Sequence, residues 1–287
     1  MTEDVRPGDA PAEERDLVLI TGMSGAGRSE ALHTFEDLGY FCIDNLPPAL
    51  LGQLVELAAL PGSRIHKVAV VCDVRGGAFF DELMSAIAQL EERGERPRIL
   101  FLTADAYGVL PPVSRLNKDQ AMLWFLMGYT SKLAGTETGV TEPQATFSRF
   151  FGQPFMPAKP AVYAAMLGEK MEKHKTRVYL INTGWSGGAY GTGRRIDITL
   201  TRKMVNAALN GELERVEYIS DDRFHVDIPR TCPGVPAEML VPENTWSDKQ
   251  AYTDTANKLA RQFSDHFDRA YGNQDISESI VRQCPGK

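Results

Sequence analysis

The stretch LVLITGMSGAGRSEALHTFEDLG, residues 17–39, decides the fold, because an apolar run, a glycine-rich turn and an amphipathic segment follow one another. The run LVLIT (17–21) predicts a buried strand, and residues 29–39 have helical spacing and end on Gly39. Between them, GMSGAGRS (22–29) has the spacing G-x-x-x-x-G-[K/R]-S of a phosphate-binding loop. The stretch therefore predicts a strand, a phosphate loop and a helix.

The chemistry of this loop depends on its glycines and on its last two residues. Glycines let backbone N–H groups wrap around phosphates, the helix N-terminus adds positive potential, and Ser29 is placed to ligate Mg²⁺. Arg28 stands where the motif has lysine, and it keeps the charge in a bulkier, forked form. A glycine-rich turn without a ligand is the alternative, and the G-x-G-x-x-G order of a dinucleotide site is absent. The phosphate-binding candidates are Gly22, Gly25, Ala26, Gly27, Arg28 and Ser29.

Similar alternation continues along the chain. Apolar runs at 40–44, 67–73 and 98–105 are separated by helical segments at 47–60 and 79–94. Near-continuous apolar strands are covered on both faces, which is typical of a parallel sheet wound by helices on each side. The sequence therefore predicts an α/β fold with a doubly wound parallel sheet of the P-loop type.

Two carboxylates end the second and third predicted strands. Asp44 follows YFCI and Asp73 follows VAVVC, where a carboxylate is able to hold the shell of a magnesium ion. An N-cap or turn role is an equal alternative for each. Together with Ser29 they are the candidate ligands for Mg²⁺, or for Mn²⁺ in its place.

The regular alternation of apolar runs and helical segments ends after residue 105, and the sequence from there on predicts a mixed α/β part. Residues 162–174 and 202–211 have helical spacing, and residues 248–272 predict a long amphipathic helix. RVYLINTGW (177–185) predicts a strand that enters a glycine-rich loop. Within that loop region, GRRIDITLTR (193–202) by itself predicts an ordinary strand with a glycine-rich entry.

The length and composition of the chain indicate how these segments are divided into domains. The chain has 287 residues and 43% hydrophobic content, which predicts about two packed domains. Residues 1–16 mix proline, glycine and acidic residues and predict a mobile tail, followed by a nucleotide-binding domain at 17–105 and a second domain at 106–287. Four cysteines without CxxC spacing suggest neither a zinc site nor a disulfide framework.

Charge and hydropathy exclude several classes of function. The sequence has no apolar run of about 18 residues and no signal-peptide order at its start, so we expect a cytoplasmic protein without membrane contact. A net charge of −7 argues against binding of nucleic acid through the overall charge of the protein, although a local basic patch is compatible with it. An anionic ligand therefore needs a site with local positive charge.

Residues 16–104 resemble the nucleotide-binding N-terminal half of RapZ/YvcJ-type proteins. The resemblance rests on LVLITGMSGAGRSEALHTFEDLGYFCIDNLPPALL and on VCDVRGG, and DLGYFCIDNLPP (37–48) is its most specific part. It implies binding of ATP or GTP. It also implies the alternative of a nucleotide-dependent regulatory protein or RNase adapter that binds RNA or a protein partner.

From FLTADAYGVLPPVSRL onward the chain resembles the C-terminal part of ATP-dependent phosphoenolpyruvate carboxykinase. Further motifs agree, among them GYTSKLAGTETGVTEPQATFSRFFGQPFMP (128–157), NTGWSGGAYGTGRRIDITLTR (182–202) and PRTCPGVPAEMLVPENTW (229–246). The resemblance implies that KLAGTE (132–137) belongs to a loop that orders over the reaction. It also implies contacts to the adenine and ribose of ATP from Arg195, Ile196, Ile198 and Thr201.

The two resemblances meet inside one strand. RILFLTAD (98–105) fits both families, so the join preserves a strand of a nucleotide-binding sheet. A recombination, an engineered fusion or a mis-assembled reading frame gives such a sequence. The carboxykinase family carries its own P-loop, its metal ligands and its substrate arginines ahead of FLTADA, where this chain has the RapZ-like segment. The combination therefore implies ATP or GTP binding without full carboxykinase turnover, and an active carboxykinase with a rebuilt P-loop is the alternative.

Overall fold

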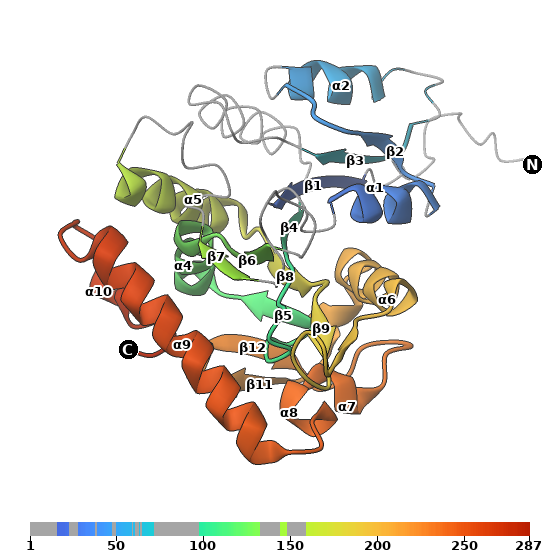
Figure 1. The fold of residues 1–287 in the computed structure, drawn as a ribbon. Helices are drawn as coiled ribbons and strands as arrows, with labels where there is room; N and C mark the ends of the chain where they lie inside the picture. The colour runs from blue at the N-terminus through green and yellow to red at the C-terminus, as the bar shows by residue number, and fades with distance from the viewer. Residues whose placement is uncertain are drawn as a thin grey trace, which may run out of the picture.

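An eight-stranded sheet forms the centre of the molecule, with the strand order β11-β12-β5-β8-β4-β1-β3-β2 (Figure 1). It is seen in a computed structural model that describes residues 16–22, 28–37, 39–47, 50–58, 60, 63, 65–71, 98–132, 144–147 and 159–287. Strands from both sides of residue 105 share this sheet. The predicted division into domains at 17–105 and 106–287 stays a prediction.

Five neighbouring strands of the sheet are parallel, as the apolar runs predict. They are β2 (Phe41–Ile43), β3 (Lys67–Val71), β1 (Asp16–Gly22), β4 (Arg98–Thr103) and β8 (Val178–Asn182). All five residues of β8 are buried, as expected for a strand covered on both faces. The α/β fold class is therefore confirmed.

The other three strands extend the sheet in antiparallel fashion. After β4 the chain turns at Pro111 and Pro112 and returns as β5 (Val113–Leu116) beside β8, and β12 (Val226–Pro229) and β11 (Tyr218–Asp221) complete this side. The sheet is therefore mixed.

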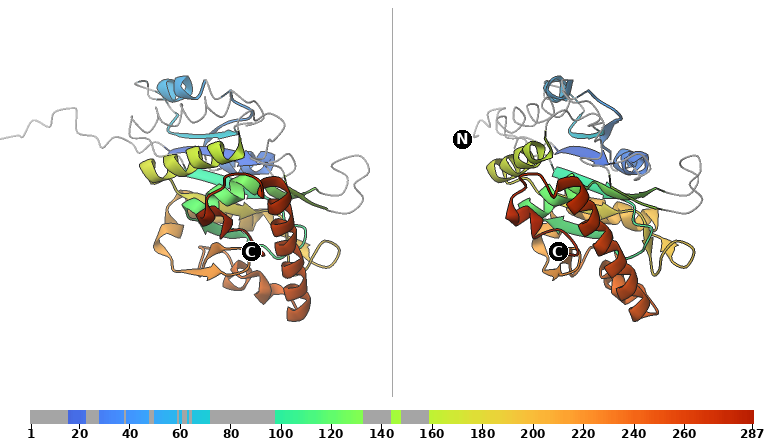
Figure 2. Two further views of the ribbon diagram at one scale, coloured as in Figure 1. Left: turned by 90° about the vertical axis from the view of Figure 1, so that its left-hand side faces the viewer. Right: turned by 60° about the vertical axis from the view of Figure 1, so that its left-hand side comes forward.

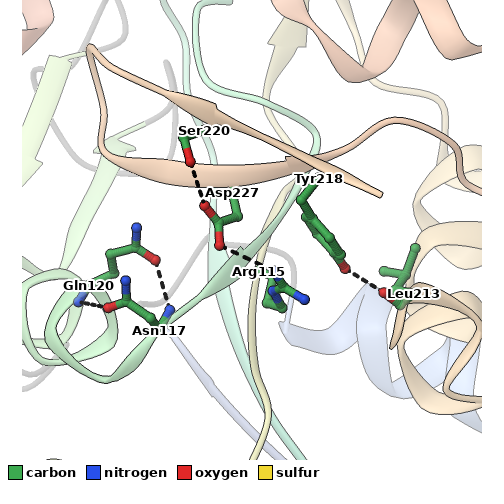
Figure 3. Close-up of polar contacts among 7 residues, drawn as sticks. All are labelled: Arg115, Asn117, Gln120, Leu213, Tyr218, Ser220 and Asp227. Carbon is green, nitrogen blue, oxygen red and sulfur yellow. Dashed lines mark hydrogen bonds and ion pairs between the residues drawn. The ribbon is translucent and has the colours of Figure 1, made fainter. Parts of the chain in front are cut away.

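A cross-strand ion pair joins β5 to β12 on this side of the sheet (Figure 3). An Nη atom of Arg115 lies 3.4 Å from one carboxylate oxygen of Asp227, and the other oxygen accepts a hydrogen bond from the Ser220 hydroxyl. The guanidinium group of Arg115 lies 3.7 Å from the centre of the Tyr218 ring. The pair therefore holds the antiparallel strands together away from the parallel half.

Helices cover both faces of the sheet (Figures 1 and 2). On one face lie α1 (Arg28–Asp37) and α6 (Ile198–Leu209), which are joined by an ion pair of 3.0 Å between Arg202 and Asp37. On the opposite face lie α4 (Lys118–Met127) and α5 (Pro160–His174). A further helix, α2 (Leu51–Ala58), connects β2 to β3.

The core on the second face is built around α4. A capping box between Asn117 and Gln120 starts this helix (Figure 3), and every residue from Gln120 to Met127 is buried. The long helix α9 (Lys249–Tyr271) packs on it, with Trp124 and Phe263 in edge contact at 5.3 Å between ring centres. The hydroxyl of Tyr271 donates to the carbonyl of Leu126 at 2.6 Å.

Short elements complete the fold. They are β6 (Tyr129–Lys132), β7 (Gln144–Phe147), β9 (Trp185–Ser186), β10 (Arg194–Arg195), a 3₁₀ helix at Glu212–Arg215, α7 (Ala237–Leu240), α8 (Pro242–Thr245) and α10 (Glu278–Val281). Within the ranges that the structure describes, none of the helices has the length and apolar character needed to cross a membrane.

Most predicted elements have their counterparts in the structure, and one is wrong. GRRIDITLTR (193–202) is not an ordinary strand, because only Arg194 and Arg195 are extended and α6 begins at Ile198. The side chain of Asp197 accepts a hydrogen bond from the backbone N–H of Thr199 at 2.7 Å and so starts the helix. The predicted helix at 79–94 lies outside the described residues.

Candidate nucleotide-binding site

Three adjacent parallel strands end at the same edge of the sheet. Gly22 at the end of β1 pairs with Leu102 of β4, and Thr103 of β4 pairs with Asn182 at the end of β8. Neighbouring strands lie about 4.8 Å apart, so the chain leaves β1 and β8 about 10 Å apart. The segments that follow these two strands are the predicted phosphate loop and the predicted base-binding segment.

The structure supplies the frame of the phosphate loop. Gly22 is the last residue of β1, and Arg28 and Ser29 are the first two residues of α1, so the strand and the helix of the motif are in place. Gly25, Ala26 and Gly27 lie outside the described residues. Their contact with phosphate stays a prediction.

The base-binding candidates divide into two exposed and two buried residues. Arg195 is exposed, and its Nε donates to the carbonyl of Thr183 at 3.1 Å. Ile198 is 40% exposed, whereas Ile196 and Thr201 are each 7% exposed. Arg195 and Ile198 are therefore accessible from solvent, whereas Ile196 and Thr201 are buried and their contact with a ligand stays a prediction.

An aromatic pair lies beside Arg195. Trp185 and Tyr190 are in edge contact with their ring centres 5.5 Å apart, and the guanidinium group of Arg195 lies 5.7 Å from the Trp185 ring centre. All three residues lie in the glycine-rich connection between β8 and α6, residues 183–197, which is called the base loop below. It offers a planar cation and apolar surface in one place, which suits a nucleobase.

The candidate metal ligands are not brought together among the described residues. Asp44 is exposed and follows β2, which is separated from β1 by β3. Asp73 lies outside the described residues, as does the segment 133–137 of KLAGTE. Within the described ranges, no group of three or more histidine, cysteine, aspartate or glutamate side chains is placed to hold a metal ion.

A buried carboxylate that the sequence analysis missed lies beneath the site. Asp105 is completely buried and accepts hydrogen bonds from the N–H groups of Tyr107, Val109 and Leu110 at 2.8–2.9 Å. It also accepts one from the hydroxyl of Tyr129 at 2.8 Å. Burial raises the pKa of Asp105, and these four hydrogen bonds oppose the rise.

Tyr129 is held in its protonated form by the same surroundings. Burial and the neighbouring charge of Asp105 raise the pKa of the Tyr129 hydroxyl well above its usual value. The hydroxyl therefore stays protonated and donates a hydrogen bond to the Asp105 carboxylate. This contact joins β6 to the segment that follows β4.

Asn182 connects Asp105 to the base loop. Its Oδ1 accepts hydrogen bonds from the backbone N–H of Asp105 at 3.0 Å and of Gly184 at 2.8 Å. Its Nδ2 donates to the carbonyl of Leu110 at 3.0 Å, and the N–H of Trp185 donates to the carbonyl of Asp105 at 2.8 Å. A signal for Asp105 was present in the sequence, because it follows an apolar strand as Asp44 does.

Comparison with protein families confirms both resemblances. Residues 77–238 match the model of phosphoenolpyruvate carboxykinase, and residues 15–115 match the model of the RapZ-like N-terminal domain. The two matches overlap around β4. The join predicted at 98–105 lies within this overlap.

Curated relatives are carboxykinases. Phosphoenolpyruvate carboxykinase (ATP) of Caldanaerobacter subterraneus is 58% identical over 192 residues, which cover 67% of this chain and 36% of the relative. The protein of the same name from Fusobacterium nucleatum is 56% identical over 199 residues, or 69% and 38% of the two chains. That of Bacillus cytotoxicus is 43% identical over 302 residues, or 94% and 56%. The chain thus spans about a third to a half of the length of these relatives. It belongs to the phosphoenolpyruvate carboxykinase family, with an N-terminal part of the RapZ-like type.

Proposed function

We propose that the chain binds ATP with Mg²⁺ across the carboxyl edge of β1, β4 and β8. The residues from Gly22 to Ser29 hold the phosphates, and the base loop with the start of α6 holds the adenine and ribose. The observation that carries the proposal is the pairing of β4 with β1 on one side and with β8 on the other. The ends of β1 and β8, from which the two segments leave, are thereby about 10 Å apart.

General features of α/β proteins support this place for the ligand. Ligands of open parallel sheets bind outside the carboxyl ends of the strands, next to helix N-termini with positive potential. Both α1 and α6 begin at segments that leave this edge. Arg195 adds a cation close to the aromatic pair.

The choice of ATP over GTP depends on the base side. The segment at Arg195, Ile196, Ile198 and Thr201 lies within the carboxykinase match, and the curated relatives are named for ATP. GTP is the alternative, and Mn²⁺ is the alternative to Mg²⁺. Ser29 remains the proposed ligand of the metal ion, with Asp44 and Asp73 as further candidates.

Saturating ATP with Mg²⁺ is expected to stabilise the fold. At about 100 times its dissociation constant, a ligand that binds only the folded state adds about 2.7 kcal/mol to the free energy of unfolding. Differential scanning fluorimetry with ATP and with GTP measures the effect. Arg195→Ala should lose most of it, while Arg230→Ala, which removes another exposed arginine on a different strand end, should keep it. No shift with either nucleotide would refute the proposal.

Carboxykinase turnover is expected to stay at background. The RapZ-like match covers residues 15–115, the part in which the carboxykinase resemblance implies a different P-loop, metal ligands and substrate arginines. Removing one charge-stabilising group from an active site costs about 3 kcal/mol of transition-state stabilisation. A coupled assay with oxaloacetate, ATP and Mg²⁺ or Mn²⁺ tests this, with an active carboxykinase of the family as the positive control. Turnover that disappears in Arg28→Ala would contradict the expectation and identify a rebuilt active site.

The RapZ-like match supports a second candidate, a nucleotide-dependent adapter that binds RNA or a protein partner. The net charge of −7 works against this candidate for RNA. RNA that stays bound in a gel-shift series at rising salt would support it, and complete loss of the shifted band would remove the RNA form.

A further inference from the structure

Four buried side chains form a polar cluster beneath the carboxyl edge: Asp105, Asn182, Tyr129 and Ser131. The cluster touches three segments that come from distant parts of the chain. They are the connection from β4 to β5, the hairpin of β6 and β7, and the base loop. Buried polar groups have a high cost when unpaired, so such a cluster fixes the segments that it joins.

Each polar atom of the two central side chains, Asp105 and Asn182, has partners of matching polarity. All four partners of the Asp105 carboxylate are donors, three backbone N–H groups and one hydroxyl. Asn182 faces two N–H donors with its oxygen and one carbonyl acceptor with its amino group. The structure therefore requires a carboxylate at 105 and an amide at 182, although the two side chains have nearly the same shape.

The base loop is attached to this pair directly. The N–H of Gly184 binds Asn182, the N–H of Trp185 binds the carbonyl of Asp105, and the N–H of Tyr190 binds the carbonyl of Ala106 at 2.8 Å. The carbonyl of Gly184 accepts from the N–H of Ile196 at 2.8 Å, just before α6. The loop is thus fixed at both ends to the segment that Asp105 organises.

We propose that Asp105 and Asn182 are positioning residues for the base-binding half of the nucleotide site. Both side chains are completely buried and so do not reach a ligand, and they act by holding the base loop so that Arg195 and Ile198 present a fixed surface. The inference rests on the proposed binding of ATP and adds the residues that set its base side. The phosphate side, which begins at Gly22, has no hydrogen bond to the pair among the described residues.

The test compares Asp105→Asn with Asp227→Asn. Both variants replace a carboxylate by an amide, but Asp227 belongs to the ion pair with Arg115 away from the site (Figure 3). Calorimetric titration measures the dissociation constants of ATP with Mg²⁺ and of tripolyphosphate with Mg²⁺, which lacks a base. Asp105→Asn should raise the dissociation constant of ATP about tenfold or more and that of tripolyphosphate less than about twofold. Asp227→Asn should bind both as the wild type does.

Hydrogen exchange without nucleotide gives an independent readout. Asp105→Asn should speed amide exchange in 104–112 and 183–197 and leave 28–37 unchanged, while Asp227→Asn should affect 113–116 and 218–229 only. If Asp105→Asn does not fold, Tyr129→Phe replaces it, since it removes one of the four donors and keeps the ring. Tyr129→Phe should raise the dissociation constant of ATP about threefold and give the same pattern of faster amide exchange on a smaller scale.

The outcomes separate the inference from the function on which it rests. Unchanged ATP binding in Asp105→Asn or in the fallback variant, or an equal loss for ATP and tripolyphosphate, overturns the positioning role. Exchange that rises equally over 28–37 also overturns it. A wild-type protein that binds neither ligand refutes the nucleotide site itself, and the positioning role with it.

Discussion

Replacing Phe263 with alanine is expected to lower the free energy of unfolding by about 3–5 kcal/mol. Phe263 is completely buried on α9. Its ring centre lies 5.3 Å from that of Trp124 and 5.0 Å from those of Tyr129 and Phe147. Large rigid rings on three sides close only partly over the cavity, so the cost includes both lost burial and the residual void.

Urea denaturation followed by circular dichroism measures this loss. Phe263→Leu, which keeps most of the volume, should cost less than about 1.5 kcal/mol. Arg261→Ala, at an exposed position on the same helix, should stay within about 0.5 kcal/mol of the wild type. A loss below about 1 kcal/mol in Phe263→Ala would show that α9 does not pack on α4 as described.

Replacing Gly184 with alanine is expected to cost about 3 kcal/mol or more. A Cβ atom added there would lie 2.1 Å from the carbonyl oxygen and 2.3 Å from the nitrogen of Asp105. Both atoms belong to the backbone, so the base loop must move away from the segment that follows β4 for the methyl group to fit. The hydrogen bond from the N–H of Gly184 to Asn182 is lost in the same movement.

Thermal unfolding of Gly184→Ala should be compared with that of Gly191→Ala. Gly191 belongs to the same loop and has a positive φ of 89°, but a Cβ atom added there has no neighbour within 4 Å. Its replacement tests backbone strain alone, at about 1–2 kcal/mol. If Gly184→Ala costs no more than Gly191→Ala, the close contact between the base loop and Asp105 is wrong.

Elements with a clear period and clear ends could be predicted from the sequence. The helix expected at 248–272 is α9, Lys249–Tyr271, because its apolar stripe is regular and Asp248 caps its first turn. The strand expected at 17–21 is β1, Asp16–Gly22, since a short apolar run before a glycine has few other solutions.

Elements set by tertiary contacts could not be predicted in this way. Helix α4 is buried on all sides, so its residues show no amphipathic period to recognise. The two-residue strand at Arg194 exists only because Ser186 and Trp185 pair with it. The order of the sheet depends on pairs such as Thr103 with Asn182, which are distant in the sequence.

The sequence predicted candidate residues for the site but not the buried residues that lie beneath it. Motif spacing indicated Gly22, the resemblance to the carboxykinase family implied Arg195, and the strand order brings the strands that precede their segments to one edge. Asp105 follows an apolar strand as Asp44 does, but its role could not be predicted because it depends on four donors that only the fold assembles. Sequence motifs therefore indicate candidate surface residues more readily than the buried residues that hold their segments in place.

The position of β4 between β1 and β8 has a consequence for shortened forms of the chain. A cut after residue 105 would separate β4 from β8 and expose one edge of a buried, mostly apolar strand, Val178–Asn182, to solvent. An uncovered apolar edge strand pairs readily with other molecules and aggregates. The segment after residue 105 thus depends on its N-terminal neighbour for solubility, and an exchange of N-terminal parts is tolerated only when the new part brings a strand that covers this edge.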